Sequence, residues 1–130
     1  MKLSASVQSS THRALLFGPP KSGKSYLAGK LSSDFDILWF DLENGVDTLR
    51  QLPMEQQERI ELISLPDSRV YPIAIETMLK VIKGAPVDIC EEHGKVACAL
   101  CKKDAKPFSS IALNQLPSST VVVVDSLTQL

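Results

Sequence analysis

Four short apolar runs stand out along the chain, each rich in branched or aromatic side chains. Such runs are typical of strands that are buried on both faces of a parallel sheet. The run TVVVV is the strongest of the four, and Asp125 ends it. We expect strands at residues 13–17, 35–42, 60–65 and 120–124.

Three stretches between these runs fit helices. Residues 47–57 contain Pro53, which must end or kink a helix at that point. Residues 24–31 and 73–83 place apolar side chains at helical spacing, and this spacing predicts the face that packs on the sheet. The predicted buried residues are Leu27, Ala28 and Leu31 in the first helix, and Ile75, Met78, Leu79 and Ile82 in the second.

Strands that alternate with helices predict an α/β fold, in which helices flank a parallel sheet. A chain of 130 residues is long enough for one domain with a core and too short for two, so we expect a single domain over residues 1–130. A doubly wound sheet would continue beyond the run at 120–124. We therefore expect this chain to be the N-terminal part of a longer protein, incomplete at its C-terminus, and a small complete protein is the alternative.

The most specific motif is GPPKSGKS at residues 18–25, which fits G-x-x-x-x-G-K-[ST] at every fixed position. Gly18 and Gly23 permit backbone angles at which successive N–H groups point inward at phosphate oxygens. Lys24 can reach the β- and γ-phosphates of a nucleotide, and the Ser25 hydroxyl can ligate Mg²⁺. The expected nucleotide-binding residues are Gly18, Pro19, Pro20, Lys21, Ser22, Gly23, Lys24 and Ser25.

Acidic residues at two strand ends are candidates to complete a magnesium–nucleotide site. Asp125 follows four valines and has the form of the carboxylate that holds Mg²⁺ beside a phosphate loop. Glu43, at the tip of a neighbouring strand, can polarise the water that attacks the γ-phosphate. Asp41 is the competing candidate, because strand alternation turns it to the same side as Glu43. An ordinary solvated turn explains Glu43 and Asp41 equally well from the residues alone.

All three cysteines and one of the two histidines fall within a short window. Their pattern is C-x₂-H-x₄-C-x₂-C, and two ligand pairs of this kind can surround a tetrahedral zinc ion. We expect a small zinc-knuckle-like insertion at residues 88–106, with a structural zinc because four protein ligands leave no open position. A flexible polar insertion with incidental cysteines is the alternative. The candidate zinc ligands are Cys90, His93, Cys98 and Cys101.

Four lysines surround the candidate zinc ligands and would offset the charge of three thiolates. They are also suited to contact a phosphate backbone. A solvated charged face explains them as well. These residues are Lys95, Lys102, Lys103 and Lys106.

Three stretches of the chain resemble the core of RecA-type recombinases, both in their order and in their residues. They are FDILWFDLENGVDTL, IELISLPD and TVVVVDSLTQL. GPPKSGKSYLA together with FDLENG is similar to phage-encoded ATPases of the AAA/RecA-like class that serve single-strand annealing and recombination. The resemblance covers residues 13–83 and 119–130. It implies a RecA-like P-loop core, with the catalytic glutamate at Glu43 and the Walker B aspartate at Asp125. It also implies ATP as the nucleotide, single-stranded DNA as a partner of the full-length protein, and assembly into a homo-oligomer.

The composition and the N-terminal residues bear on the partners and the location expected of this protein. The net charge of −1 provides no whole-chain attraction to nucleic acid or anionic lipid. No apolar run approaches the roughly 20 residues that span a bilayer, and the N-terminal residues lack an apolar core of signal-peptide length. We expect a protein of the cytoplasm, in a bacterial or phage-infected host cell, with no membrane partner.

The leading hypothesis is a magnesium-dependent ATPase, a P-loop hydrolase that cleaves the γ-phosphate of ATP in DNA recombination or single-strand annealing. In it Lys24, Glu43 and Asp125 are the catalytic residues, and Ser25 and Asp125 hold Mg²⁺. A small-molecule kinase of the zinc-containing nucleoside type is the second hypothesis. A nucleotide-binding fragment without turnover is the third. For residues 1–130 alone we expect slow or absent hydrolysis.

Overall fold

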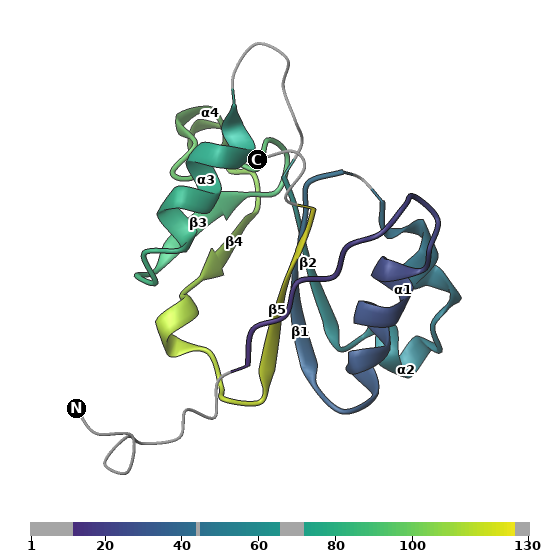
Figure 1. Ribbon diagram of the computed structural model, residues 1–130. Helices are drawn as coiled ribbons and strands as arrows, with labels where there is room; N and C mark the ends of the chain where they lie inside the picture. The colour runs from purple at the N-terminus through teal and green to yellow at the C-terminus, as the bar shows by residue number, and fades with distance from the viewer. Residues whose placement is uncertain (1–11, 44, 66–71, 127–130) are drawn as a thin grey trace, which may run out of the picture.

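Three parallel strands form the central sheet of this computed structural model, which describes residues 12–43, 45–65 and 72–126. The strands lie in the order β2-β1-β5 (Figure 1). Their bounds are β1 (Asp36–Asp41), β2 (Ile60–Ser64) and β5 (Thr120–Asp125). Asp41, the last residue of β1, is aligned with Ser64 of β2 and with Asp125 of β5. The predicted parallel α/β sheet and three of its four predicted strands are thus confirmed.

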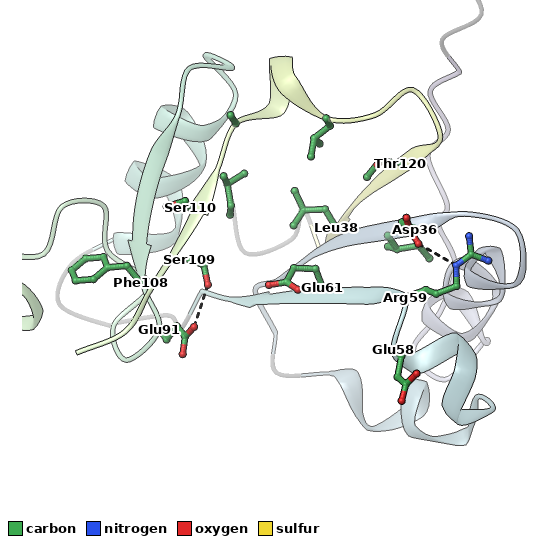
Figure 2. A pocket seen from close by; sticks show the side chains of 14 residues that line it. Asp36, Leu38, Glu58, Arg59, Glu61, Glu91, Phe108, Ser109, Ser110 and Thr120 are labelled. Atoms are coloured by element: carbon green, nitrogen blue, oxygen red, sulfur yellow. Dashed lines mark hydrogen bonds and ion pairs between the residues drawn. The ribbon is translucent and has the colours of Figure 1, made fainter. Parts of the chain in front are cut away.

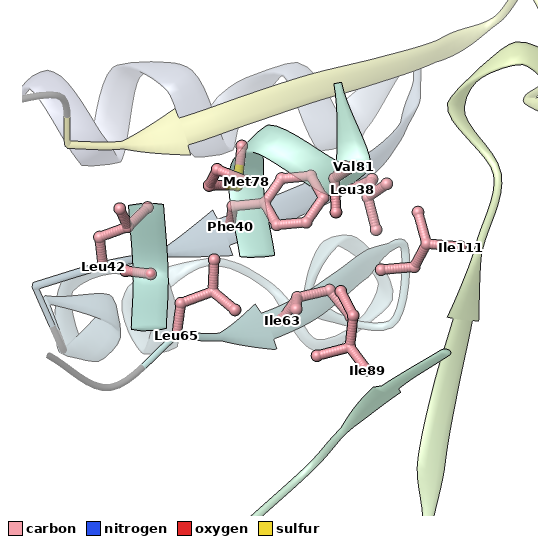
Figure 3. Packing of buried hydrophobic residues seen from close by; sticks show 10 residues of the cluster. Leu38, Phe40, Leu42, Ile63, Leu65, Met78, Val81, Ile89 and Ile111 are labelled. Carbon is pink, nitrogen blue, oxygen red and sulfur yellow. The ribbon is translucent and has the colours of Figure 1, made fainter. Parts of the chain in front are cut away.

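The side chains of β1 alternate between the two faces of the sheet, so each face has its own core. Ile37 and Trp39 pack with Leu49 and Leu52 on the face that carries α1. The other face is covered by α3 and a β-hairpin, and its core includes Leu38, Phe40, Met78, Val81, Ile89 and Ile111 (Figure 3). Trp39 and Phe40 are fully buried. Burying each such side chain stabilises the fold by about 2–3 kcal/mol.

The first face of the sheet carries short helices. α1 (Lys24–Gly29) begins within the last two residues of the loop at 18–25, which we call the phosphate loop after its motif, and continues as the 3₁₀ helix η2 (Lys30–Ser33). The predicted helix at 47–57 is divided at Pro53, as its missing N–H requires. The two parts are η3 (Val46–Gln51) and α2 (Met54–Gln57).

The second face carries α3 (Ile73–Val81) and an antiparallel hairpin (Figure 1). The hairpin consists of β3 (Val87–Cys90) and β4 (Phe108–Ile111), with α4 (Ala99–Lys103) in the connection between them. The short helix η4 (Leu113–Gln115) then leads into β5. Residues 84–107, which show no period in the sequence, therefore contain regular structure.

The predicted strand at residues 13–17 is wrong. These residues have no regular structure, and Leu15 and Phe17 are 70% and 88% exposed. A strand needs a partner for its backbone N–H and C=O groups. Within the described residues, the sheet pairs β1 with β2 and β5 and includes no pairing for this segment.

The predicted buried faces of two helices are right only in part, because Met78 of α3 is buried and Ala28 of α1 packs against the core around Trp39, as predicted. In α3, Leu79 and Ile82 are 55% and 62% exposed, because the helix turns Ala74, Thr77, Met78 and Val81 inward. In the first helix, Leu27 and Leu31 are 59% and 42% exposed. There the contact is made at Gly29, where an added Cβ would lie 2.5 Å from Leu49 Cδ2. So close an approach needs a residue without a side chain, which leaves no apolar signal in the sequence.

Candidate functional site

The phosphate loop closes on itself through the side chain of its lysine. Lys24 Nζ donates to the carbonyl oxygens of Gly18 and Pro19, at 2.8 and 3.0 Å. Lys21 and Gly23 have positive φ angles of 62° and 88°, so the backbone curls tightly between the two ends of the loop. The ammonium group is therefore held against the carbonyl oxygens at the start of the loop.

The strand register brings two distant parts of the chain together at the loop. Trp39 of β1 and Val123 of β5 face the α1 side, and the alternation continues to Asp41 and Asp125 at the strand ends. Ser25, near the start of α1, donates its hydroxyl hydrogen bond to Asp125 Oδ2 at 2.8 Å. The two residues predicted to hold Mg²⁺ are thus neighbours in space.

Asp41 is poorly placed to activate a water molecule, because that role requires a carboxylate that a bound molecule can reach. It is buried, and its Oδ1 accepts hydrogen bonds from the backbone N–H groups of Glu43 and Gly45, at 3.2 and 3.3 Å. The side chain of Glu43, in contrast, is exposed at the tip of β1. Asp41 therefore shapes the turn that presents Glu43, and Glu43 is the better placed of the two acids for chemistry with a bound molecule.

Ser126 is a site residue that the sequence did not single out. Its hydroxyl donates to Glu43 Oε1 at 2.6 Å. Leu42 N–H also donates to the backbone oxygen of Asp125, at 2.7 Å, so the ends of β1 and β5 are joined beyond the last aligned pair. The only signal in the sequence was that Ser126 directly follows Asp125, and that spacing alone assigns no role.

The electrostatics of this strand edge favour a cation. The pKa of Asp125 is raised above its usual 3.8, first because burial disfavours the charged form and also because Glu43 and Asp41 are negative neighbours. The hydrogen bond from Ser25 and the charge of Lys24 act in the opposite direction. The negative charges of Glu43 and Asp41 therefore lie near enough to Asp125 to oppose its ionisation.

Two cavities differ in the charge of the residues that line them. One of about 420 Å³ is lined by part of the phosphate loop, including Lys24, together with residues such as Phe17 and Leu27. The other, about 650 Å³, lies between the sheet and the hairpin, and Glu58, Arg59, Glu61 and Glu91 line it (Figure 2). Carboxylates repel anions, so the cavity at the loop is the more favourable of the two for an anionic group.

The four predicted zinc ligands converge on one point, and we call them the metal cluster. Their ligand atoms all lie within 4.8 Å of one another. His93 Nδ1 is 3.2 Å from Cys101 Sγ and 3.8 Å from both Cys90 Sγ and Cys98 Sγ. Zinc–sulfur and zinc–nitrogen bonds of about 2.3 and 2.0 Å give tetrahedral edges of about 3.5–3.8 Å. The residues therefore fit a tetrahedral metal ion such as zinc.

A tight turn makes the short spacing between the two ligand pairs possible. Gly94 has a φ angle of 66°, and its N–H donates to the backbone oxygen of Cys90 at 2.9 Å. Lys95 N–H donates to Cys90 Sγ at 3.4 Å, the kind of hydrogen bond that orients a thiolate ligand at a metal ion. The C-x₂-H and C-x₂-C pairs are in this way folded against each other, and all three sulfurs are buried.

The thiols of the metal cluster differ in acidity. The pKa of Cys98 falls to about 7, chiefly because the backbone N–H of Cys101 donates to its sulfur. Burial, and after it the neighbouring Cys98 and Cys90, raise the pKa of Cys101 to about 12. Among the four lysines, Lys106 lies 3.8 Å from Glu92, and both of these side chains are about half exposed.

Comparison of the chain with protein-family models, curated proteins and solved structures gave no match. The class that fold and site define is thus a mixed α/β protein with a three-stranded parallel sheet and a Cys/His cluster able to hold a metal ion. In the described part of the chain, no helix is both long enough and apolar enough to cross a membrane.

Proposed function

We propose that this chain is the ATP-binding domain of a magnesium-dependent ATPase with a RecA-like core. One observation carries the proposal: the Ser25 hydroxyl of the phosphate loop lies 2.8 Å from Asp125 Oδ2 at the end of a parallel strand. Ser25 and Asp125 are separated by 100 positions in the chain. A loop that matched the motif by chance has no reason to meet a strand-end carboxylate at its serine.

Each residue of the site then has a role in γ-phosphate hydrolysis. Backbone N–H groups of the phosphate loop bind the phosphates, and Lys24 moves from the Gly18 and Pro19 carbonyls to neutralise them. Ser25 and Asp125 would hold Mg²⁺, which would supply charge neutralisation for the bound phosphates. Glu43 orients a water and accepts its proton as the water oxygen attacks the γ-phosphorus, while the bond from that phosphorus to the bridging oxygen breaks and ADP leaves.

The biological setting of the proposal rests on the resemblance of the sequence to recombination ATPases. By that resemblance, the full-length protein acts on single-stranded DNA in recombination or annealing, as a homo-oligomer in the cytoplasm of a bacterial or phage-infected cell. The metal cluster is not needed for hydrolysis in this proposal. Four protein ligands close the coordination sphere, so zinc would stabilise the hairpin on the second face of the sheet.

Titration calorimetry with Mg-ATP tests the proposal directly. We expect micromolar to submillimolar affinity for the chain and at least about 100-fold weaker binding for Lys24→Ala, because the lost ammonium pairs with the phosphates. Lys83→Ala is the matched control, since Lys83 is exposed beyond the end of α3. Equal affinity of the chain and its Lys24→Ala variant, with both folded by circular dichroism, would rule the loop out as the site.

A second measurement tests the proposed action on single-stranded DNA. We expect ATP hydrolysis to be slow in this chain alone and to rise with single-stranded DNA in the full-length protein. Phosphate release is followed with and without an oligonucleotide. Transfer of the γ-phosphate to a nucleoside in place of water would identify a kinase, and rapid DNA-independent turnover by residues 1–130 would contradict the recombination setting.

A further inference from the structure

We infer that Ser126 is a positioning residue, which holds the Glu43 carboxylate for its work on the attacking water and couples it to the magnesium ligand Asp125. The inference rests on the proposed function and adds to it a residue that the motif does not contain. It comes from the geometry at the tips of β1 and β5, where residues 42–43 of one strand meet residues 125–126 of the other.

Glu43 needs an external restraint to act on a water molecule. Its side chain is exposed and has three rotatable bonds, and it lies beyond the last residue of β1. A general base or water-positioning group works only when it is held close to its productive geometry, and misplacement by about 1 Å costs on the order of 100-fold in rate. An exposed glutamate does not meet this condition by itself.

The structure provides that restraint at both ends of the residue. The buried Asp41 accepts the Glu43 backbone N–H at 3.2 Å, which fixes where the side chain begins. Ser126 donates to Oε1 at 2.6 Å, which fixes where it ends. A carboxylate has about four lone-pair sites, so one hydroxyl donor at Oε1 is compatible with a hydrogen bond from an attacking water.

Ser126 also couples Glu43 to Asp125, the proposed magnesium ligand. Ser126 is the next residue after Asp125, whose side chain contacts Ser25 and whose backbone oxygen accepts from Leu42 N–H at 2.7 Å. A shift of Asp125 toward a metal ion would therefore move Ser126, and with it the oxygen of Glu43 that Ser126 holds. One strand end thus links metal binding to the placement of the water-orienting carboxylate.

Single-turnover hydrolysis, with the chain in excess over radiolabelled Mg-ATP, tests the inference even when turnover is slow. For Ser126→Ala we expect the rate constant at saturating protein to fall about 10-fold, while the half-saturating concentration changes less than twofold. Ser126→Thr keeps the hydroxyl and should restore most of the rate. Ser109→Ala is the matched control, because Ser109 also donates to a glutamate, Glu91, but at 3.4 Å and away from the loop (Figure 2).

Variants of Glu43 separate failure of this inference from failure of the proposed function. Glu43→Gln should be slow, and the double variant Glu43→Gln/Ser126→Ala should be no slower, because the two residues act as one unit. A normal rate for Ser126→Ala beside a slow Glu43→Gln overturns the inference alone. A faster Ser126→Ala chain also overturns it, since the bond would then hold Glu43 away from the water. A normal rate for Glu43→Gln overturns both proposals, and so does bound Mg-ATP that is cleaved neither by this chain nor by the full-length protein with single-stranded DNA.

Discussion

The metal cluster and the candidate nucleotide site are built over very different lengths of chain. The four metal ligands lie between Cys90 and Cys101, on one hairpin connection. The nucleotide site joins the phosphate loop to Glu43 and to Asp125, and its key hydrogen bond spans 100 positions. The thiols are buried, whereas the loop and Glu43 are exposed.

This difference shows how far a spacing pattern can specify a site. A turn at Gly94 suffices to bring two ligand pairs together, so the local pattern already implies the cluster. The nucleotide site depends on the sheet order β2-β1-β5, because only this order places the ends of β1 and β5 side by side. The two regions should therefore respond differently to the loss of one residue.

Removal of a metal ligand should have the largest effect on stability. For His93→Ala we expect loss of zinc and a fall in the free energy of unfolding of about 4 kcal/mol, with zinc held near 1,000 times its dissociation constant. Metal analysis and thermal denaturation measure the two quantities. His12→Ala is the control, since His12 is exposed and outside the cluster. One zinc per chain in His93→Ala would show that the histidine is not a ligand.

His93→Ala also tests whether the candidate nucleotide site is independent of the metal cluster. The cluster lies on the hairpin face of the sheet and the phosphate loop on the α1 face. At a temperature where the variant stays folded, its affinity for Mg-ATP should stay within threefold of the unchanged chain. A larger loss would mean that the two regions are not independent.

The next largest effect is expected at Glu43. For Glu43→Gln we expect single-turnover hydrolysis to fall about 100-fold, because a water-activating carboxylate contributes about that much. The affinity for Mg-ATP should be retained. Calorimetry and radiolabelled phosphate release measure the two quantities, and Glu61→Gln, an exposed glutamate of β2, is the control. A parallel loss of binding would assign Glu43 to the ligand set instead.

A smaller effect is expected where α3 supports the metal cluster. Thr77 is buried and donates to the Gly94 carbonyl at 2.7 Å, which anchors the turn between the ligand pairs. For Thr77→Val, a substitution of nearly equal shape, we expect a loss of about 1–2 kcal/mol of stability, because the buried carbonyl loses its donor. Thr48→Val at an exposed position is the control in chemical denaturation. An unchanged midpoint would mean that the cluster needs no support from outside its own turn.

The smallest effect is expected at Asp125 in the magnesium-free protein. Because its pKa is raised in the folded state, its ionised form is disfavoured there. This carboxyl group therefore contributes most stability below its usual pKa of 3.8, and that contribution is lost as pH rises through the raised value. At pH 7 we expect Asp125→Asn to be more stable by about 0.5 kcal/mol, after allowance for solvent screening.

Thermal denaturation between pH 7 and pH 3.8 checks the sign of the effect of Asp125→Asn on stability. The stability difference between Asp125→Asn and the unchanged chain should shrink as pH falls toward 3.8, while Asp104→Asn, at an exposed position, should show no such trend. Binding should move the other way, with weaker Mg-ATP affinity in Asp125→Asn. A variant that is less stable at pH 7 would contradict the assigned electrostatics.

Local order was predictable from the sequence wherever one segment determines its own structure. The runs that became β1, β2 and β5, the division at Pro53 and the four metal ligands all depend on spacing and backbone chemistry within a few residues. The apolar run at 13–17 does not form the predicted strand, because a strand needs a partner for its backbone hydrogen bonds. The predicted buried face of α3 is right only in part, because Thr77 faces inward to meet Gly94.

The phosphate loop and the two acids were therefore candidates by sequence, and only the tertiary structure made them neighbours. Strand order and register place Asp125 against Ser25, turn Asp41 into the anchor of a turn and bring Ser126 to Glu43. The physical reason is the range of the interactions. Backbone propensity and ligand spacing act over a few residues, whereas the meeting of two strand ends depends on burying both faces of the sheet at once.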